Sequence, residues 1–183
     1  MFILTALLGV LLSTPASQAG SQSWYVVNDS VMGGMSESEV VDLDAGEVLF
    51  RGQLSLENNG GFASTRTAGL PEDWRGNSGL MMQVVGDGRT YIATIRTRYR
   101  HLRNVYYRQS FDTVAGEPIT VNLPFSQFEA YAYGTRIPQA PPLTSLLDRL
   151  DSTGVMLADK NAGPFELRIA EVQPYYAAEA AAD

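Results

Sequence analysis

The chain has 183 residues, a formal net charge of −7 from 13 basic and 20 acidic side chains, and no cysteine. This length suits one domain with a buried core. The missing cysteine excludes disulfides, thiolate metal ligands and cysteine nucleophiles, and the negative charge argues against nucleic-acid binding, which needs a basic surface.

The first segment has the pattern of a secretory leader. Residues 2–12 are almost wholly apolar, and Ser17 and Ala19 place small side chains at the −3 and −1 positions of a cut after Ala19. The run is too short to span a bilayer. It lacks the Lys or Arg that usually precedes the apolar run of a leader. A buried first strand or helix is therefore the alternative interpretation. We predict a signal peptide over 1–19, a secreted or periplasmic location, one domain over 20–176, no integral membrane segment after cleavage, and a flexible tail over 177–183.

Beyond the leader, short β-type runs alternate with glycine-containing turns at intervals of about 8–12 residues, as in a sandwich or barrel. We predict strands over 24–28, 39–43, 48–57, 61–67, 80–85, 90–99, 105–111, 119–123, 154–158 and 165–172. In the third of these, Val48 and Phe50 face one side and Leu49 and Leu54 the other. Gly52 would then mark a bulge or a point of close approach.

One segment favours a helix. Thr144 is a suitable cap, Leu146, Leu147 and Leu150 follow it, and the polar cluster 151–154 would end the helix. The predicted fold is therefore an all-β, antiparallel jelly-roll sandwich with one short helix.

Three segments combine short polar side chains with glycine pairs or tight turns at strand junctions. Each is either part of a ligand- or partner-binding site or a rigid turn that locks its strands together. The candidate residues are Asn28, Asp29, Met32, Gly33, Gly34 and Ser36 in the first segment, Asn59, Gly60, Gly61 and Arg66 in the second, and Asp159 and Lys160 in the third.

These segments resemble the motifs of one protein family. The motifs are Asn28-Asp29-x-Val31-Met32-Gly33-Gly34-x-Ser36, the run from Glu57 to Arg66, and Asp159-Lys160-x-x-Gly163-Pro164-Phe165, with 86–91 and 123–128 also fitting. Over roughly Trp24 to Pro174 the chain is similar to the complex I intermediate-associated protein 30 family. The resemblance implies a galactose-binding-domain-like jelly roll. It also implies a non-catalytic role, because the mitochondrial members are known as assembly factors for respiratory complex I.

Arginines gather between residues 89 and 108, where there is no acidic residue. Alternation places Arg96, Arg98 and Arg100 on one strand face, where like charges cost energy unless acids or an anionic ligand offset them. Carboxylates on neighbouring strands are one explanation. The other is an anion-recognising face on which the tyrosines, namely Tyr99, Tyr106 and Tyr107, stack against a sugar or an aromatic group.

Catalytic and metal sites have weaker support. His101 is the only histidine and has no nucleophile-elbow motif to serve, so we expect an exposed loop residue there. The spacing Asp42-x-Asp44-x-Gly46-Glu47 loosely resembles a calcium loop, but a hairpin turn explains it better. Spacing alone leaves open a glycosidase pair of Asp29 and Asp159. We expect no metal and no cofactor.

Two functional hypotheses follow. The first is a non-catalytic interaction module of the cell envelope, of assembly-factor or chaperone-like type, acting on a protein partner. The second is a carbohydrate-binding module that recognises a glycan through its arginine and tyrosine side chains and its loops. The partner is accordingly a protein or a glycan, and not a nucleic acid.

Overall fold

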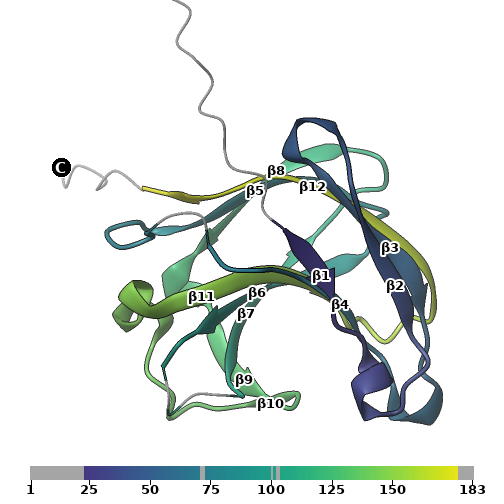
Figure 1. Cartoon of the computed structure of the whole chain (residues 1–183), viewed down its shortest axis with the longest axis horizontal. Helices are drawn as coiled ribbons and strands as arrows, with labels where there is room; N and C mark the ends of the chain where they lie inside the picture. Colours follow the sequence, from purple (N-terminus) through teal and green to yellow (C-terminus); the bar gives the residue numbers. More distant parts are fainter. Residues whose placement is uncertain (1–22, 71–72, 100, 102–103, 177–183) are drawn as a thin grey trace, which may run out of the picture.

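A computed structural model describes residues 23–70, 73–99, 101 and 104–176, which form two stacked antiparallel sheets (Figure 1). Within this described part, one sheet has the order β1 (Trp24–Val26), β4 (Ala63–Thr67), β11 (Leu150–Leu157), β6 (Thr90–Thr97), β7 (Tyr106–Asp112), β9 (Glu129–Ala132) and β10 (Thr135–Arg136). The other has the order β2 (Glu37–Asp42), β3 (Val48–Leu54), β12 (Gly163–Tyr175), β5 (Gly79–Val85) and β8 (Pro118–Pro124). The predicted antiparallel sandwich is confirmed.

Each predicted strand coincides with an observed one, because alternating side chains and glycine turns mark most of them clearly. The prediction missed the hairpin of β9 and β10. These two strands are short, and their turn contains Tyr133 and Gly134, both at positive φ. The signal peptide predicted over 1–19 and the tail predicted over 177–183 lie outside the described residues. No helix among the described residues has the length and hydropathy needed to cross a bilayer.

The short helix predicted over 144–150 is not one continuous helix. The segment forms two 3₁₀ turns, η6 (Leu143–Ser145) and η7 (Leu147–Arg149), and β11 begins directly afterwards at Leu150. The polar cluster that suggested a helix end is the first half of β11. There the Thr153 amide donates to Thr67 Oγ1 at 3.1 Å and the Thr153 hydroxyl donates to the Thr94 carbonyl at 3.1 Å. Thr153 is thus bonded to both neighbouring strands, which satisfies its polar groups in a buried strand.

The core lies between the two sheets and supplies most of the stabilising apolar burial. Phe50 and Phe165, from adjacent strands of the five-stranded sheet, contact each other with ring centroids 4.9 Å apart. Tyr107 belongs to this core, since its ring is buried and its hydroxyl donates to the Pro141 carbonyl at 2.7 Å. Its predicted role as an outward stacking partner is therefore wrong.

Gly52 is a point of close approach and not a bulge. The register of β3 with β2 and with β12 runs through Gly52 without a shift. Val48, Phe50 and Leu54 are consequently all buried on one face, which corrects the predicted sidedness of Leu54. A Cβ at Gly52 would lie 2.1 Å from the Glu37 carbonyl oxygen, so the spacing of β2 and β3 depends on the missing side chain.

We therefore expect Gly52→Ala to force β2 away from β3 and to lower the free energy of unfolding by about 2–3 kcal/mol. Gln53→Ala, at the neighbouring exposed position, serves as the control and should change stability by about 0.5 kcal/mol or less. Urea denaturation measures both. An unchanged midpoint for Gly52→Ala would show that the strands can separate without cost.

Candidate functional site

The first glycine segment is organised by the carboxylate of Asp29. This residue begins the 3₁₀ turn η1 (Asp29–Met32), and its side chain is 0% exposed. Oδ1 accepts the Ser36 amide at 2.9 Å. Oδ2 accepts the Ser36 hydroxyl at 2.6 Å, the Gly61 amide at 2.6 Å and the Phe62 amide at 3.2 Å. Asp29 thus ties its own loop to the loop between β3 and β4.

Two of the glycines are required because Asp29 occupies the space beside them. A Cβ on Gly34 would lie 2.4 Å from Cγ of Asp29, and a Cβ on Gly60 would lie 2.7 Å from its Oδ2. Gly33 has a different reason, since it ends η1 in the left-handed region with φ of 88°. The glycine pairs therefore allow the two loops to close around one carboxylate.

The charge of Asp29 is maintained by its donors. Burial raises the pKa of the carboxyl, but hydrogen bonds from Ser36, Gly61 and Phe62 favour the ionised form and outweigh burial. The pKa of Asp29 consequently lies below its ordinary value. We call Asp29, Ser36, Gly60 and Gly61 the aspartate hub.

Outside the hub the same two loops expose large apolar side chains. The exposed fractions are 71% for Val31, 61% for Met32, 54% for Met35 and 44% for Leu56. The hydrogen bonds of Asp29 hold these loops side by side, at the lower right of Figure 1. We call these four side chains the apolar tip. Of these four, only Met32 is among the candidate site residues predicted from the sequence, because exposure cannot be read from a short apolar run.

The other candidate residues of these loops have smaller roles. Asn28 accepts the Ser38 hydroxyl through Oδ1 at 2.7 Å and so joins η1 to β2. Asn59 is exposed and has φ of 59°. Arg66, at the end of the second segment, does not join the hub, because it lies on β4 between buried Thr65 and Thr67 and points to the outer face of the seven-stranded sheet.

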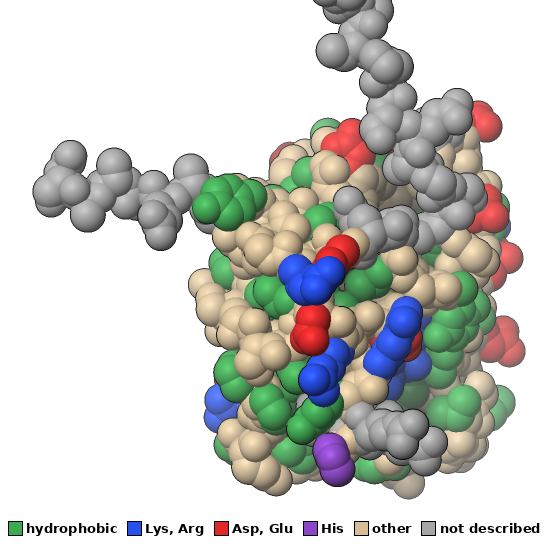
Figure 2. Space-filling view, turned by 60° about the vertical axis from the view of Figure 1, so that its left-hand side comes forward, with side chains coloured by type: hydrophobic (Ala, Val, Ile, Leu, Met, Phe, Trp, Pro, Cys, Tyr) green, Lys and Arg blue, Asp and Glu red, His purple; other side chains and the backbone are tan. Residues whose placement is uncertain are grey.

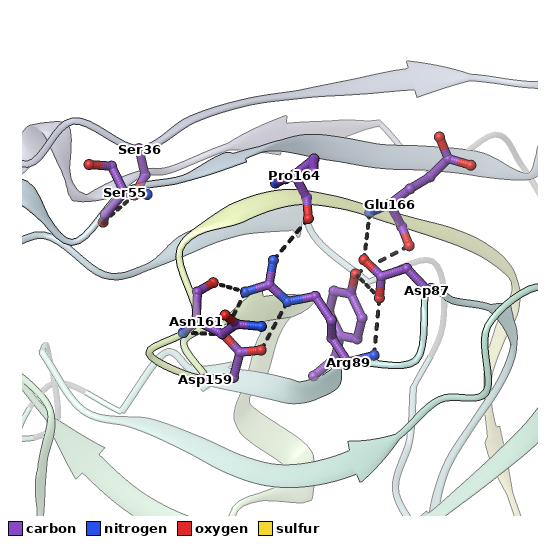
Figure 3. A network of polar contacts seen from close by, with 9 residues as sticks. Ser36, Ser55, Asp87, Arg89, Asp159, Asn161, Pro164 and Glu166 are labelled. Carbon is purple, nitrogen blue, oxygen red and sulfur yellow. Dashed lines mark hydrogen bonds and ion pairs between the residues drawn. The ribbon is translucent and has the colours of Figure 1, made fainter.

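Asp159, in the third segment, holds Arg89 (Figure 3). The guanidinium donates from Nε at 2.9 Å and from Nη2 at 2.7 Å to the two carboxylate oxygens of Asp159. It also donates to the carbonyl oxygens of Asn161 and Pro164. The guanidinium lowers the pKa of Asp159 against the opposing effect of burial, and Asp159 raises the pKa of Arg89. Lys160 is exposed at the turn, with φ of 61°.

Asp87 completes this cluster on the other side of Arg89. Its carboxylate accepts the Arg89 amide at 3.2 Å, the Tyr91 hydroxyl at 3.1 Å and the Glu166 amide at 3.0 Å. Burial and the charge of Asp87 raise the pKa of Tyr91. The cluster joins the turn before β6 to β12, and its polar groups are directed at one another.

A third group lies on the outer face of the seven-stranded sheet. Strand register places Tyr25 beside Arg66, Arg66 beside Gly154, and Thr94 beside Arg108. The neighbouring outward row carries Ser152, Arg96, Tyr106 and Tyr131. We call Tyr25, Arg66, Arg96, Tyr106, Arg108 and Tyr131 the arginine–tyrosine face.

The predicted arginine set is partly reassigned. Arg96 belongs to this face, but Arg98 lies beyond the end of β6 and pairs with Asp151 at 3.0 Å, as the carboxylate explanation expects. Arg100 lies outside the described residues. His101 is exposed, with its ring centroid 5.4 Å from that of Tyr99. Figure 2 shows the side of the molecule that carries His101, where acidic and basic side chains alternate above the histidine.

Asp29 and Asp159, the suggested glycosidase pair, each accept several hydrogen bonds from the protein itself. The suggested calcium loop is the hairpin turn η2 (Asp44–Gly46) between β2 and β3. In the described part of the chain, no group of three or more histidine or acidic side chains has a metal-binding arrangement.

We expect Asp29→Asn to lower the free energy of unfolding at neutral pH by about 3 kcal/mol, since an amide nitrogen would face backbone donors. Because the pKa of Asp29 is lowered in the folded state, its stabilisation is present above the unfolded value of about 3.9 and is lost as the pH falls through the folded value. The stability difference between wild type and variant should therefore shrink below pH 4.

Urea denaturation at pH 7 and at pH 2.5 measures this difference. Asp44→Asn, at an exposed turn position, is the control and should change stability little at either pH. A deficit for Asp29→Asn that stays constant down to pH 2.5 would contradict the proposed role of the ionised carboxylate.

Solved structures with the same β-sandwich fold include carbohydrate-binding modules. The family 11 carbohydrate-binding module of a Clostridium thermocellum cellulosomal cellulase has a TM-score of 0.62 and 17% identity, over 95% of this chain and 93% of that one. A family 30 carbohydrate-binding module has a TM-score of 0.53 and 11% identity, over 90% of each chain. At these identities the likeness concerns the fold alone.

A curated relative is the mitochondrial complex I intermediate-associated protein 30 of Mus musculus, 30% identical over 166 residues. The match covers 80% of this chain and 50% of the relative, so the chain spans about half the length of that protein. The relative is mitochondrial, which overturns the predicted periplasmic or secreted location. That prediction rested on an apolar start with a small-residue exit, and the family match begins at residue 14, inside that segment.

The family model for complex I intermediate-associated protein 30 matches residues 14–169, which is most of the chain. The aspartate hub and Arg89 with Asp159 lie within this range and are formed by the motifs that suggested the resemblance. The chain belongs to the complex I intermediate-associated protein 30 family.

Proposed function

We propose that the chain is a non-catalytic module that associates with a protein partner through the apolar tip. The observation that carries the proposal is the exposure of Val31, Met32, Met35 and Leu56 on two adjoining loops. Grouped exposed apolar side chains are typical of interaction sites, and methionine adapts its shape to a partner surface. Family membership supports the same direction, since the family is one of assembly factors.

The aspartate hub makes the apolar tip suited to binding. Asp29 bonds to residues on both loops, so the loop backbones are held before a partner arrives. Binding then costs less conformational entropy than it would for free loops. Removing apolar side chains from water on association supplies the favourable free energy.

A non-catalytic role is supported by the carboxylates of the family motifs, which are bonded within the protein itself. Asp29 accepts its bonds from Ser36, Gly61 and Phe62, and Asp159 is paired with Arg89. Carboxylates with lowered pKa values that are bonded within the protein are poorly suited to general acid catalysis, which needs a proton to donate near neutral pH.

We expect the double variant Val31→Ser and Met32→Ser to capture at least tenfold less partner protein than the wild type does from an extract of the source cells. Val114→Ser removes another exposed valine, between β7 and β8, and should capture as well as the wild type. Both variants should melt within a few degrees of the wild type, because exposed positions contribute little to stability. Equal capture by the double variant would contradict the proposal.

Glycan binding on the arginine–tyrosine face is the second candidate. The specific observation is the pair Tyr106 and Tyr131, two half-buried residues whose ring centroids are 6.4 Å apart on adjacent strands of the outer sheet face. Aromatic rings of this kind offer flat apolar surfaces with a polar edge. The carbohydrate-binding modules that share the fold make this candidate worth testing.

A glycan array tests this second candidate. If it holds, at least one glycan should bind, and Tyr106→Ala should reduce that signal at least tenfold while Tyr176→Ala, at an exposed residue beyond β12, leaves it unchanged. An array without a signal, or a signal that survives in Tyr106→Ala, would exclude glycan recognition by this face.

A further inference from the structure

Arginines on the outer face of the seven-stranded sheet lack the carboxylate partner that every other described arginine has. Among the described residues, each arginine elsewhere has a carboxylate within 4.0 Å: Arg51, Arg75, Arg89, Arg98, Arg136, Arg149 and Arg168. Arg66, Arg96 and Arg108 form no ion pair with any described residue. All three belong to the arginine–tyrosine face.

The side chains between these arginines are small. On β11, which lies between Arg66 and Arg96, the outward positions are Ser152 and Gly154. On β6 the outward neighbour of Gly154 is Thr94. The long side chains of β4 on one side and of β6 and β7 on the other therefore border short, buried ones, and Arg66 extends over Gly154, where an added Cβ would lie 3.1 Å from its Cγ.

Tyrosines orient two of the guanidinium groups. The central carbon of the Arg108 guanidinium lies 3.4 Å from the ring centroid of Tyr131, and that of Arg96 lies 5.5 Å from the ring centroid of Tyr106. A guanidinium stacked on a ring keeps its N–H edge available, and that edge matches a carboxylate in a bidentate pair.

The energetics of the face also favour an anion. Like charges on neighbouring strands repel unless an opposite charge is present. Burial lowers the pKa of Arg66, and the charge of Arg96 lowers it further. Glu129 is the register neighbour of Arg108, but it pairs with Arg136 at 2.6 Å. Although the protein carries a net charge of −7, its described carboxylates do not neutralise this face.

We propose that the arginine–tyrosine face binds an acidic segment of the protein partner, with aspartate or glutamate carboxylates on Arg66, Arg96 and Arg108. This inference rests on the proposed function, because it assigns the chemistry of a second contact with the same partner. Arg66 and Arg108 are three strand spacings apart, roughly 14 Å. In an extended segment, same-side carboxylates four residues apart span about 13 Å, which matches that separation.

The test uses a ten-residue peptide of alternating glutamate and serine, with a glutamine–serine peptide as the neutral control. Fluorescence anisotropy should show binding of the acidic peptide only, weakened at least tenfold between 50 and 300 mM salt because the contacts are ionic. The double variant Arg66→Gln and Arg96→Gln should lose at least tenfold in affinity. Its melting temperature should not fall, since the substitutions remove like-charge repulsion.

Arg98→Gln is the matched control and should bind the peptide as the wild type does, because Arg98 already has Asp151 as its partner. Met32→Ser should also leave peptide binding unchanged, so failure of the apolar tip as a docking site is distinguishable from failure of this inference. An acidic peptide that does not bind, or that binds equally to the Arg66 and Arg96 variant, would overturn the inference. So would an oligogalacturonate that binds at least tenfold more tightly than the peptide, because the face would then select an acidic glycan.

Discussion

The buried carboxylate of Asp29 is the interaction on which the functional end of the molecule depends. A charge removed from water is costly unless donors replace the lost hydration, and Ser36, Gly61 and Phe62 supply those donors. Gly34 and Gly60 are part of the same arrangement, because any side chain there would occupy the space of the carboxylate. One ionised group therefore determines how two loops, far apart in the sequence, meet beside the sheets.

Sequence patterns predicted the sandwich well and the site only in part. Alternating side chains between glycine turns identified most strands, whereas β9 and β10 were too short to detect. The cluster 151–154 was misread because Thr153 bonds to both neighbouring strands. Asp29 was recognised as a candidate, but its role depends on amides 32 and 33 residues away. The grouping of Arg66 with Arg96 and Arg108 depends on strand register, which no local pattern reveals.

The family motifs and the surfaces proposed to bind a protein partner have separate roles. Asp29, Arg89 and Asp159 direct their polar groups inward and join loops to strands, so they build the scaffold. The apolar tip and the arginine–tyrosine face direct their side chains outward, and Arg66, Arg96 and Arg108 form no ion pair with a described residue. A partner with an apolar patch and an acidic segment would use both, which offers more selectivity than either surface alone.

Amide hydrogen exchange at Gly61 and Phe62 tests most directly whether Asp29 holds the two loops rigidly. Both amides donate to the buried carboxylate and belong to a connection that would otherwise be free to open. We predict protection comparable to that of amides in the central strands, and its loss in Asp29→Asn under conditions where those strands stay protected. Exchange at Gly61 and Phe62 in the wild type as fast as in an exposed loop would contradict this account.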